Sequence, residues 1–120
     1  MSAMLLFALV LAPEQPSRDP VHTGIALLRM CEDADDKKPI TVDSAGCASY
    51  IIGSADASLF YSQLYSSEVP FRVFCAPKEA TYAQYVKVVV KYLRDHPERL
   101  HESRQLLVQD ALHAAFPCRK

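Results

Sequence analysis

The clearest hydrophobic pattern lies in the last third of the chain. Apolar residues recur there at spacings of three, four and seven positions, which is the period of an α-helix: Val86, Val89, Val90 and Leu93. Lysine and arginine side chains fall on the opposite face, at positions 87, 91 and 94. The pattern predicts a helix with one buried aliphatic face and one basic face in solvent.

Capping signals set the bounds of this helix and of the next one. Thr81 and Gln84 form a T-x-x-Q capping box, in which each side chain bonds the backbone N–H of the other. Proline is favoured in the first turn of a helix, so Pro97 is expected to begin a fourth helix where the third one ends. The apolar face of that fourth helix is expected to hold Leu100, Leu107, Ala111, Ala114 and Ala115.

Two more helices are expected in the first half of the chain. A short apolar stripe predicts a first helix from His22 to Cys31. A second should begin after Asp43 or Ser44, either of which can cap it, and run to about Ser66. Its expected inner face contains Cys47, Tyr50, Ile51, Ser54, Ser58 and Tyr61.

Small residues at positions 53–58 (GSADAS) thin the middle of the second helix, so that a neighbouring helix can approach there. Asp56 lies in this stretch. It either faces water or is a buried carboxylate bound to backbone N–H groups or to an arginine, because an unpaired buried charge is costly. We expect structural roles for this residue and for Tyr50, Thr81, Gln84 and Pro97.

These elements predict an all-α fold, a small antiparallel bundle of about four helices, because short connections make consecutive helices antiparallel neighbours. Only three glycines occur and alternating apolar and polar runs are scarce, which disfavours a sheet. A length of 120 residues allows one domain.

The N-terminal region favours export. Residues 4–12 (MLLFALVLA) are apolar and too few to span a bilayer, but they have the length of the core of a secretory signal. No Lys or Arg precedes them and Pro13 follows them, so a buried first helix or strand is the alternative. We expect a candidate signal peptide at 1–12, a proline-rich linker at 13–20 and a helical domain at 21–120.

The charge balance excludes one class of function. Thirteen Lys and Arg against 14 Asp and Glu give a net charge of -1, which leaves no cation excess for broad nucleic-acid binding. The charges are unevenly placed, however. Residues 1–77 carry 5 positive and 9 negative side chains, and residues 78–120 carry 8 and 5. Such polarity suits steering of a charged partner or head-to-tail association.

Four cysteines in a short chain indicate disulfides if the protein is exported, and metal or redox chemistry if it is not. Cys31 ends the first expected helix and Cys47 begins the second, while Cys75 precedes the third and Cys118 follows the fourth. In an antiparallel bundle the ends within each pair meet. Of the three pairings, Cys31–Cys47 with Cys75–Cys118 therefore fits the topology best.

The rival interpretation is a zinc site that combines cysteines with His22, His96, His101 or His113. It lacks a C-x-x-C pair, and His96 and His101 miss the i, i+4 spacing of two ligands on one helix. The chain also lacks a G-x-S-x-G elbow, a phosphate-binding glycine loop and an H-E-x-x-H motif. We therefore predict that the protein is not an enzyme and uses no metal or other cofactor.

Two stretches of the chain carry recognisable motifs. Residues 47–57 (CASYIIGSADA) read Cys-x-x-Tyr-Ile-x-Gly-x-x-Asp-Ala. Residues 74–118 contain Phe-Cys-x-Pro, the capping Thr and Gln, Tyr-Leu followed by His-Pro-Glu, and a closing Ala-Leu-x-x-Ala-Phe-Pro-Cys. Together these motifs resemble the Rap/Tai group of periplasmic immunity proteins. The resemblance covers roughly residues 22 to 118, with the loops at 32–45 and 62–73 least matched.

The resemblance implies a helical, disulfide-bonded protein in the periplasm of a Gram-negative bacterium. Characterised members of the family bind peptidoglycan amidases that neighbouring cells deliver by type VI secretion, and they occlude the active-site cleft, often as dimers. The implied partners are a cognate secreted amidase and a second copy of the chain, with no nucleic acid and no membrane span. The alternatives are an envelope structural or housekeeping protein of the same fold, and a small hydrolase or metal-binding protein.

Two loops are candidates for contact with such a partner. The acidic loop between Glu32 and Asp43 is held by the Cys31–Cys47 bridge, so little ordering entropy is lost on binding. The loop at 66–74 offers side chains of the kind that dominate interfaces. A solvated connection is the alternative for each loop. The candidate partner-binding residues are Glu32, Asp33, Asp35, Asp36, Glu68, Phe71 and Arg72.

Overall fold

The computed structural model describes residues 20–34, 37–64 and 74–119. It contains the helices α1 (Gly24–Cys31), α2 (Val42–Leu64), α3 (Tyr82–Asp95) and α4 (Arg104–Ala115), with a 3-10 turn, η1 (Pro97–Arg99), between the last two. The expected helical class is confirmed, and the β structure of the described residues is one isolated bridge. The expected signal peptide at 1–12 and the linker up to residue 19 lie outside the described residues.

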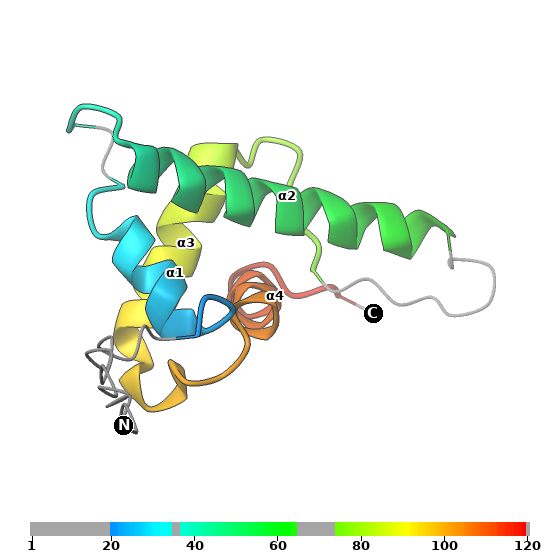
Figure 1. The fold of residues 1–120 in the computed structure, drawn as a ribbon. Coiled ribbons are helices and arrows are strands. Elements are labelled where there is room, and N and C mark those ends of the chain that lie inside the picture. The colour runs from blue at the N-terminus through cyan, green and yellow to red at the C-terminus, as the bar shows by residue number, and fades with distance from the viewer. Residues whose placement is uncertain (1–19, 35–36, 65–73, 120) are drawn as a thin grey trace, which may run out of the picture.

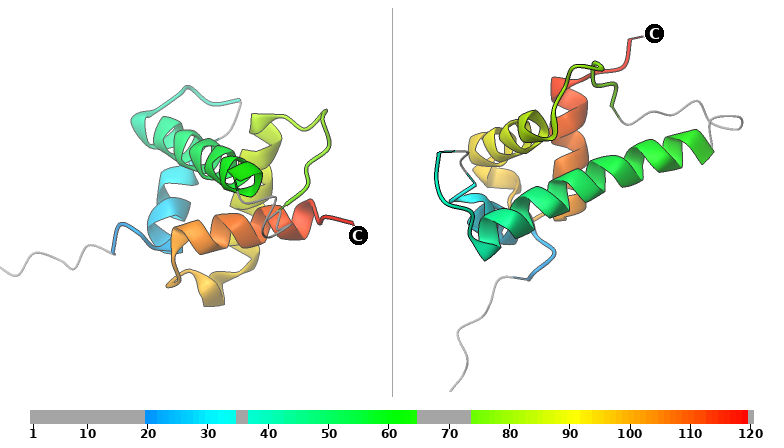
Figure 2. Two further views of the ribbon diagram at one scale, coloured as in Figure 1. Left: turned by 90° about the vertical axis from the view of Figure 1, so that its right-hand side faces the viewer. Right: turned by 90° about the horizontal axis from the view of Figure 1, so that it is seen from above.

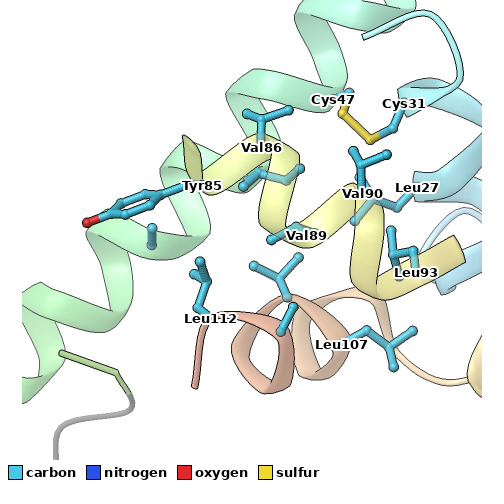
Figure 3. Close-up of a cluster of buried hydrophobic side chains, with 14 of the residues drawn as sticks. Leu27, Cys31, Cys47, Tyr85, Val86, Val89, Val90, Leu93, Leu107 and Leu112 are labelled. Atoms are coloured by element: carbon cyan, nitrogen blue, oxygen red, sulfur yellow. A yellow bond between two sulfur atoms is a disulfide. The ribbon is translucent and has the colours of Figure 1, made fainter. Parts of the chain in front are cut away.

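α3 packs against each of the other three helices. All of its expected aliphatic stripe is buried, and it meets Leu27 of α1, Ile51 of α2 and Leu107 of α4 in one core (Figure 3). Thr81 is its N-cap, with the hydroxyl accepting a hydrogen bond from Gln84 N at 3.2 Å. The sequence pattern therefore located this helix correctly at both its start and its buried face.

The fourth expected helix is divided in two. Pro97 begins only the short turn η1, and α4 does not start until Arg104. Backbone carbonyls between η1 and α4 accept hydrogen bonds from the start of α1 instead. Ile25 N donates to Leu100 O at 2.9 Å, and Gly24 N donates to Glu102 O at 3.0 Å. Because these acceptors satisfy free N–H groups at the start of α1, the chain leaves helical geometry there.

The expected apolar face of α4 was partly wrong. Ala114 and Ala115 are exposed, while Val108 and Leu112 are buried together with Leu107 and Ala111. The four buried residues share one helical face. By spacing, Ala114 and Ala115 continue this face, but they lie in the last turn of α4, where burial has ended after Leu112.

α2 is longer than the surface that the other three helices offer it for packing. In Figures 1 and 2 its second half extends beyond the ends of the other helices. Burial accordingly stops at Ala55, and Tyr61, which was expected on the inner face, is 59% exposed. The small residues do admit α4, but at Ser54 and not at Gly53, which has no side-chain neighbour within 4 Å of an added Cβ.

Two disulfides close the fold, and both expected pairings are confirmed. Cys31 and Cys47 join α1 to α2 with a Cα–Cα distance of 5.1 Å. Cys75 and Cys118 join the segment before α3 to the one after α4 with a Cα–Cα distance of 4.9 Å. Because all four sulfur atoms are bonded, none is left as a thiolate for zinc.

Candidate partner-binding surfaces

The structure places only part of the expected contact residues. Asp35, Asp36, Glu68, Phe71 and Arg72 lie outside the described residues. Glu32 and Asp33 are exposed and directly follow α1. Asp33 accepts a hydrogen bond from Lys38 Nζ at 3.3 Å, so the described parts of the acidic loop are joined by an ion pair.

Two reciprocal hydrogen bonds at the start of α2 fix the C-terminal end of the acidic loop. Ser44 N donates to Thr41 Oγ1 at 3.0 Å, and Thr41 N donates to Ser44 Oγ at 2.8 Å. Thr41 therefore caps α2, and the expectation that Asp43 or Ser44 would do so was wrong. Both of those residues lie in the first turn, where the Ser44 side chain forms the returning bond of a capping box.

A basic cavity of ≈ 540 Å³ lies between the acidic loop and α3. The lysines and the arginine on the outer face of α3 line one side, and the loop lines the other. Lys91 is paired with Asp95 across one turn of α3. Lys87, Lys91 and Arg94 are exposed, as the sequence pattern predicts, and the loop faces them across the cavity. The charged lining residues are Glu32, Lys37, Lys38, Lys87, Lys91, Arg94 and Asp95.

A second hollow, which we call the apolar groove, lies between the first half of α2 and the start of α3. It has a volume of ≈ 470 Å³, and the charged residues that line it in the described segments are Lys38 and Lys87. Ile40, which is 87% exposed, stands at its edge. The groove exists because small side chains face each other across the two helices: Ala45, Ala48 and Ser49 from α2, and Ala83 from α3.

The last two turns of α2 form a third surface, which we call the arm (residues 57–64). Four large side chains are exposed on it: Leu59 at 36%, Phe60 at 57%, Tyr61 at 59% and Leu64 at 55%. Figure 1 shows the arm projecting past α4. Neither the alternation nor the helical period of the sequence distinguishes this half of α2 from its buried half.

Asp56, at the base of the arm, is exposed, so the water-facing alternative describes it. Its carboxylate lies 3.5 Å from the Tyr82 hydroxyl, which donates to it. This contact connects the base of the arm to the first residue of α3.

A polar seam holds α2 on α4. The hydroxyls of Tyr50 and Ser54 both donate to Gln105 Oε1, at 3.2 Å and 3.0 Å. Arg104 places its guanidinium 4.1 Å from the centre of the Tyr50 ring, within the range of a cation–π contact. Together with the core at Ile51, this seam fixes the first half of α2 and so the direction in which the arm points.

The perturbed ionisable groups belong to structural contacts. Arg99 bonds Glu102 at 2.6 Å and Asp110 at 2.7 Å, and these bonds raise its pKa. Burial raises the pKa of Tyr85. In the described segments no three His, Cys, Asp or Glu side chains gather as a metal site would require, and no helix has the length and apolar character to cross a membrane.

Comparison with known proteins supports the resemblance that the cysteine and helix motifs carry. A comparison with curated proteins finds no match. The family model described as Rap1a immunity proteins matches residues 23–118, a stretch that runs from the N-cap of α1 to the last cysteine. The chain therefore belongs to the Rap1a immunity protein family.

Proposed function

We propose that the protein is a periplasmic immunity protein that binds and occludes a peptidoglycan amidase delivered by type VI secretion. The observation that carries this proposal is the family match over residues 23–118, which includes all four cysteines and all four helices. The protein then acts by binding alone, and the cell that makes it and its kin keep their cell wall intact.

The disulfides support the periplasm as the compartment. Disulfide bonds persist in the bacterial periplasm and are rare in the cytosol, where thiols are kept reduced. Both pairs join segments that the fold brings together, so they belong to the folded domain. The apolar run at residues 4–12 has the length of a secretory signal core, which agrees with export.

The arm and the loop that follows it support occlusion of a cleft. A cleft is filled by a projecting element, and the arm projects beyond the other helices while exposing Phe60 and Leu64 (Figure 2). Aromatic side chains that enter a pocket contribute most of the binding energy in many interfaces. The residues after the arm carry the expected anchors Phe71 and Arg72.

Of the two loops, the one after the arm is favoured as the occluding element. The acidic loop borders the basic face of α3, and its Asp33 already pairs with Lys38. Inserting such carboxylates into a cleft would first break contacts within the protein. The arm has no such competing contact to lose at Phe60, whose described ring contact is with the neighbouring Tyr61.

The test is protection of growing cells. A candidate cognate amidase, chosen from the reading frames adjacent to this gene, is directed to the periplasm of a susceptible bacterium, with and without this protein. We expect growth arrest without the protein and growth with it. A matched control lacks residues 1–12, stays in the cytoplasm and is expected not to protect. Growth arrest that the full protein leaves unchanged would reject the proposal for this pair and favour an envelope protein without a toxin partner.

A further inference from the structure

We propose that two glutamines of α4, Gln105 and Gln109, are positioning residues for toxin binding. They hold the arm in the direction in which it enters the cleft of the toxin, and so they set the rate at which the complex forms. This inference rests on the proposed function, because it takes the arm as the occluding element. It adds that residues outside the arm determine whether the arm is ready to bind.

The arm depends for its direction on the contacts at its base. Burial on α2 ends at Ala55, and Ser54, with 6% of its surface exposed, is the last buried polar residue before the arm. Leu64 lies 10 residues beyond Ser54, or about 15 Å at 1.5 Å per residue. A tilt of about 10° at the base would therefore move the end of the arm by about 2.6 Å.

The base of the arm is also the place where α2 bends most easily. Ser58 Oγ donates to Ser54 O, four residues earlier, at 3.0 Å, and a serine bonded in this way often bends a helix. Gly53 precedes this turn, and glycine is a poor helix former. The helix backbone alone therefore does not fix the direction of the arm.

Both polar groups of Ser54 contact α4. Its hydroxyl donates to Gln105 Oε1 at 3.0 Å, and its carbonyl accepts a hydrogen bond from Gln109 Nε2 at 3.3 Å. Tyr50, one turn earlier on α2, donates its hydroxyl to the same Gln105 oxygen at 3.2 Å. The two glutamines lie one turn apart on α4. They therefore hold against α4 the turn of α2 that directly precedes the arm.

The printed contact from α3 at this place is weaker. The Tyr82 hydroxyl donates to Asp56 at 3.5 Å, which is long for a hydrogen bond, and both residues are exposed to competing water. The bonds from the glutamines involve a buried serine, whose polar groups need partners within the protein. The seam with α4 is therefore the stronger restraint on the direction of the arm.

An arm that is held in one direction binds faster than one that samples several. The apparent affinity falls in proportion to the fraction of molecules in which the arm has the binding direction, so a fraction of about a tenth raises the dissociation constant about tenfold. This loss appears in the association rate, because the toxin itself holds the arm once the complex has formed. Loss of a direct contact with the toxin would instead appear mainly in the dissociation rate.

The first experiment measures the direction of the arm in the protein alone. Residual dipolar couplings of backbone N–H groups give the orientation of residues 57–64 relative to α4. Gln105→Met combined with Gln109→Met keeps the side-chain length and removes the bonding atoms. We expect the arm couplings to change in this double variant. They should stay as in the unmodified protein in Gln105→Glu, whose carboxylate still accepts bonds from both hydroxyls.

The second experiment measures the rates of binding to the purified candidate amidase by surface plasmon resonance. We expect the double variant to associate about tenfold more slowly and to dissociate at an unchanged rate. Gln105→Glu should bind as the unmodified protein does. Leu93→Val is the control for lost stability: it shortens a core side chain near the end of α3 that is farther from the arm, and both rates should be unchanged.

The outcomes separate this inference from the proposed function. An arm direction that is the same in the double variant overturns the inference, whether or not the amidase binds. A rise in the dissociation rate alone, or equal slowing in Leu93→Val, also overturns it. If the direction changes but association does not, another surface enters the cleft: the inference is overturned and the immunity function stands. If the unmodified protein does not bind the amidase, the function fails for this pair, and the dipolar couplings alone support or overturn the positioning role.

Discussion

At the scale of single residues, position 24 requires a glycine because of contacts with residues far away in the chain. A Cβ at this position would lie 2.3 Å from Leu107 Cδ1 and 3.2 Å from Leu100 O. Its N–H also bonds Glu102 O, so the backbone cannot easily move away. Close approach of α1 to the turn before α4, and not an unusual backbone angle, therefore requires glycine here.

We predict opposite effects for two glycine substitutions. Gly24→Ala should lower the free energy of unfolding by about 1–3 kcal/mol, because the added methyl overpacks a filled site. Gly53→Ala is the matched control: Gly53 lies exposed within α2 with open space around it, so the change should raise stability by up to about 1 kcal/mol through helix propensity. Urea denaturation measures both. Equal effects of the two changes would contradict this account.

The two helix caps show what a local motif can and cannot reveal. The Thr81 cap was predictable because a T-x-x-Q box has a known signature and precedes a strong stripe. The Thr41 cap was missed because Ser44 takes the position where the usual box has Glu or Gln. The role of Gly24 was not predictable at all, since Leu100 and Leu107 contact it only after folding.

At the scale of elements, Arg99 ties the end of η1 to both neighbouring helices. It donates to the Tyr92 hydroxyl of α3 at 2.5 Å, to Asp110 of α4 at 2.7 Å, and to Glu102. The bond from Arg99 holds the pKa of Glu102 below its ordinary value of 4.5. The turn that interrupts the fourth expected helix is thus fixed by charged hydrogen bonds.

The lowered pKa of Glu102 predicts a dependence of stability on pH. A carboxyl whose pKa is lower in the folded state stabilises the fold above its ordinary pKa, and this contribution is lost as the pH falls through the folded-state pKa. Glu102→Gln should therefore be less stable than the unmodified protein at pH 7, with the gap closing toward pH 3. Thermal unfolding across this range measures it, with Glu79→Gln as a control. A gap that does not change with pH would refute the assignment.

The two disulfides are predicted to differ in their contribution to stability. In the loop-entropy model, the Cys31–Cys47 bridge, with a sequence separation of 16, contributes about 3 kcal/mol. The Cys75–Cys118 bridge, with a separation of 43, contributes about 4 kcal/mol. Paired Cys→Ala variants unfolded in urea give both values. A larger loss of unfolding free energy when the Cys31–Cys47 bridge is removed would contradict the order that the loop-entropy model predicts.

Elements with a strong stripe were predicted well, and elements rich in alanine were not. α3 has four consecutive β-branched or leucine positions on one face, and its bounds and burial follow from them. The alanines of α4 share one face, but only Ala111 is buried, because burial ends before the last turn and periodicity does not show where it ends. The interruption at η1 depends on the need of α1 for hydrogen-bond acceptors, which a pattern read along the chain does not contain.

At the scale of the whole molecule, the two oppositely charged halves of the chain meet within the fold. The acidic loop belongs to the negative half and α3 to the positive half, yet they line one cavity together. The two kinds of charge are therefore partly mixed on the folded surface, where Glu32 of the loop and the lysines of α3 line the same cavity. The molecule thus presents two contrasting surfaces. One is the largely basic cavity beside α3, and the other is the arm with its exposed apolar side chains.

The helical class, the disulfide pairing and the family were predictable from the sequence. Each depends on local motifs that follow one another in a fixed order along the chain. The candidate surfaces were predictable only in part. Loops at 32–43 and 66–74 were visible as connections between helices, but the apolar groove arises where alanines of α2 and α3 face each other. The arm arises from a length mismatch between α2 and its neighbours (Figure 2). Both depend on packing rather than on any local signal.

The most direct test of the central claim is a titration of amidase activity. The same candidate cognate amidase, purified, digests isolated peptidoglycan while the protein is added in increasing amounts. Occlusion predicts that activity falls in proportion to the added protein and is abolished once the protein is in molar excess. Undiminished amidase activity in the presence of excess folded, disulfide-bonded protein would contradict the account.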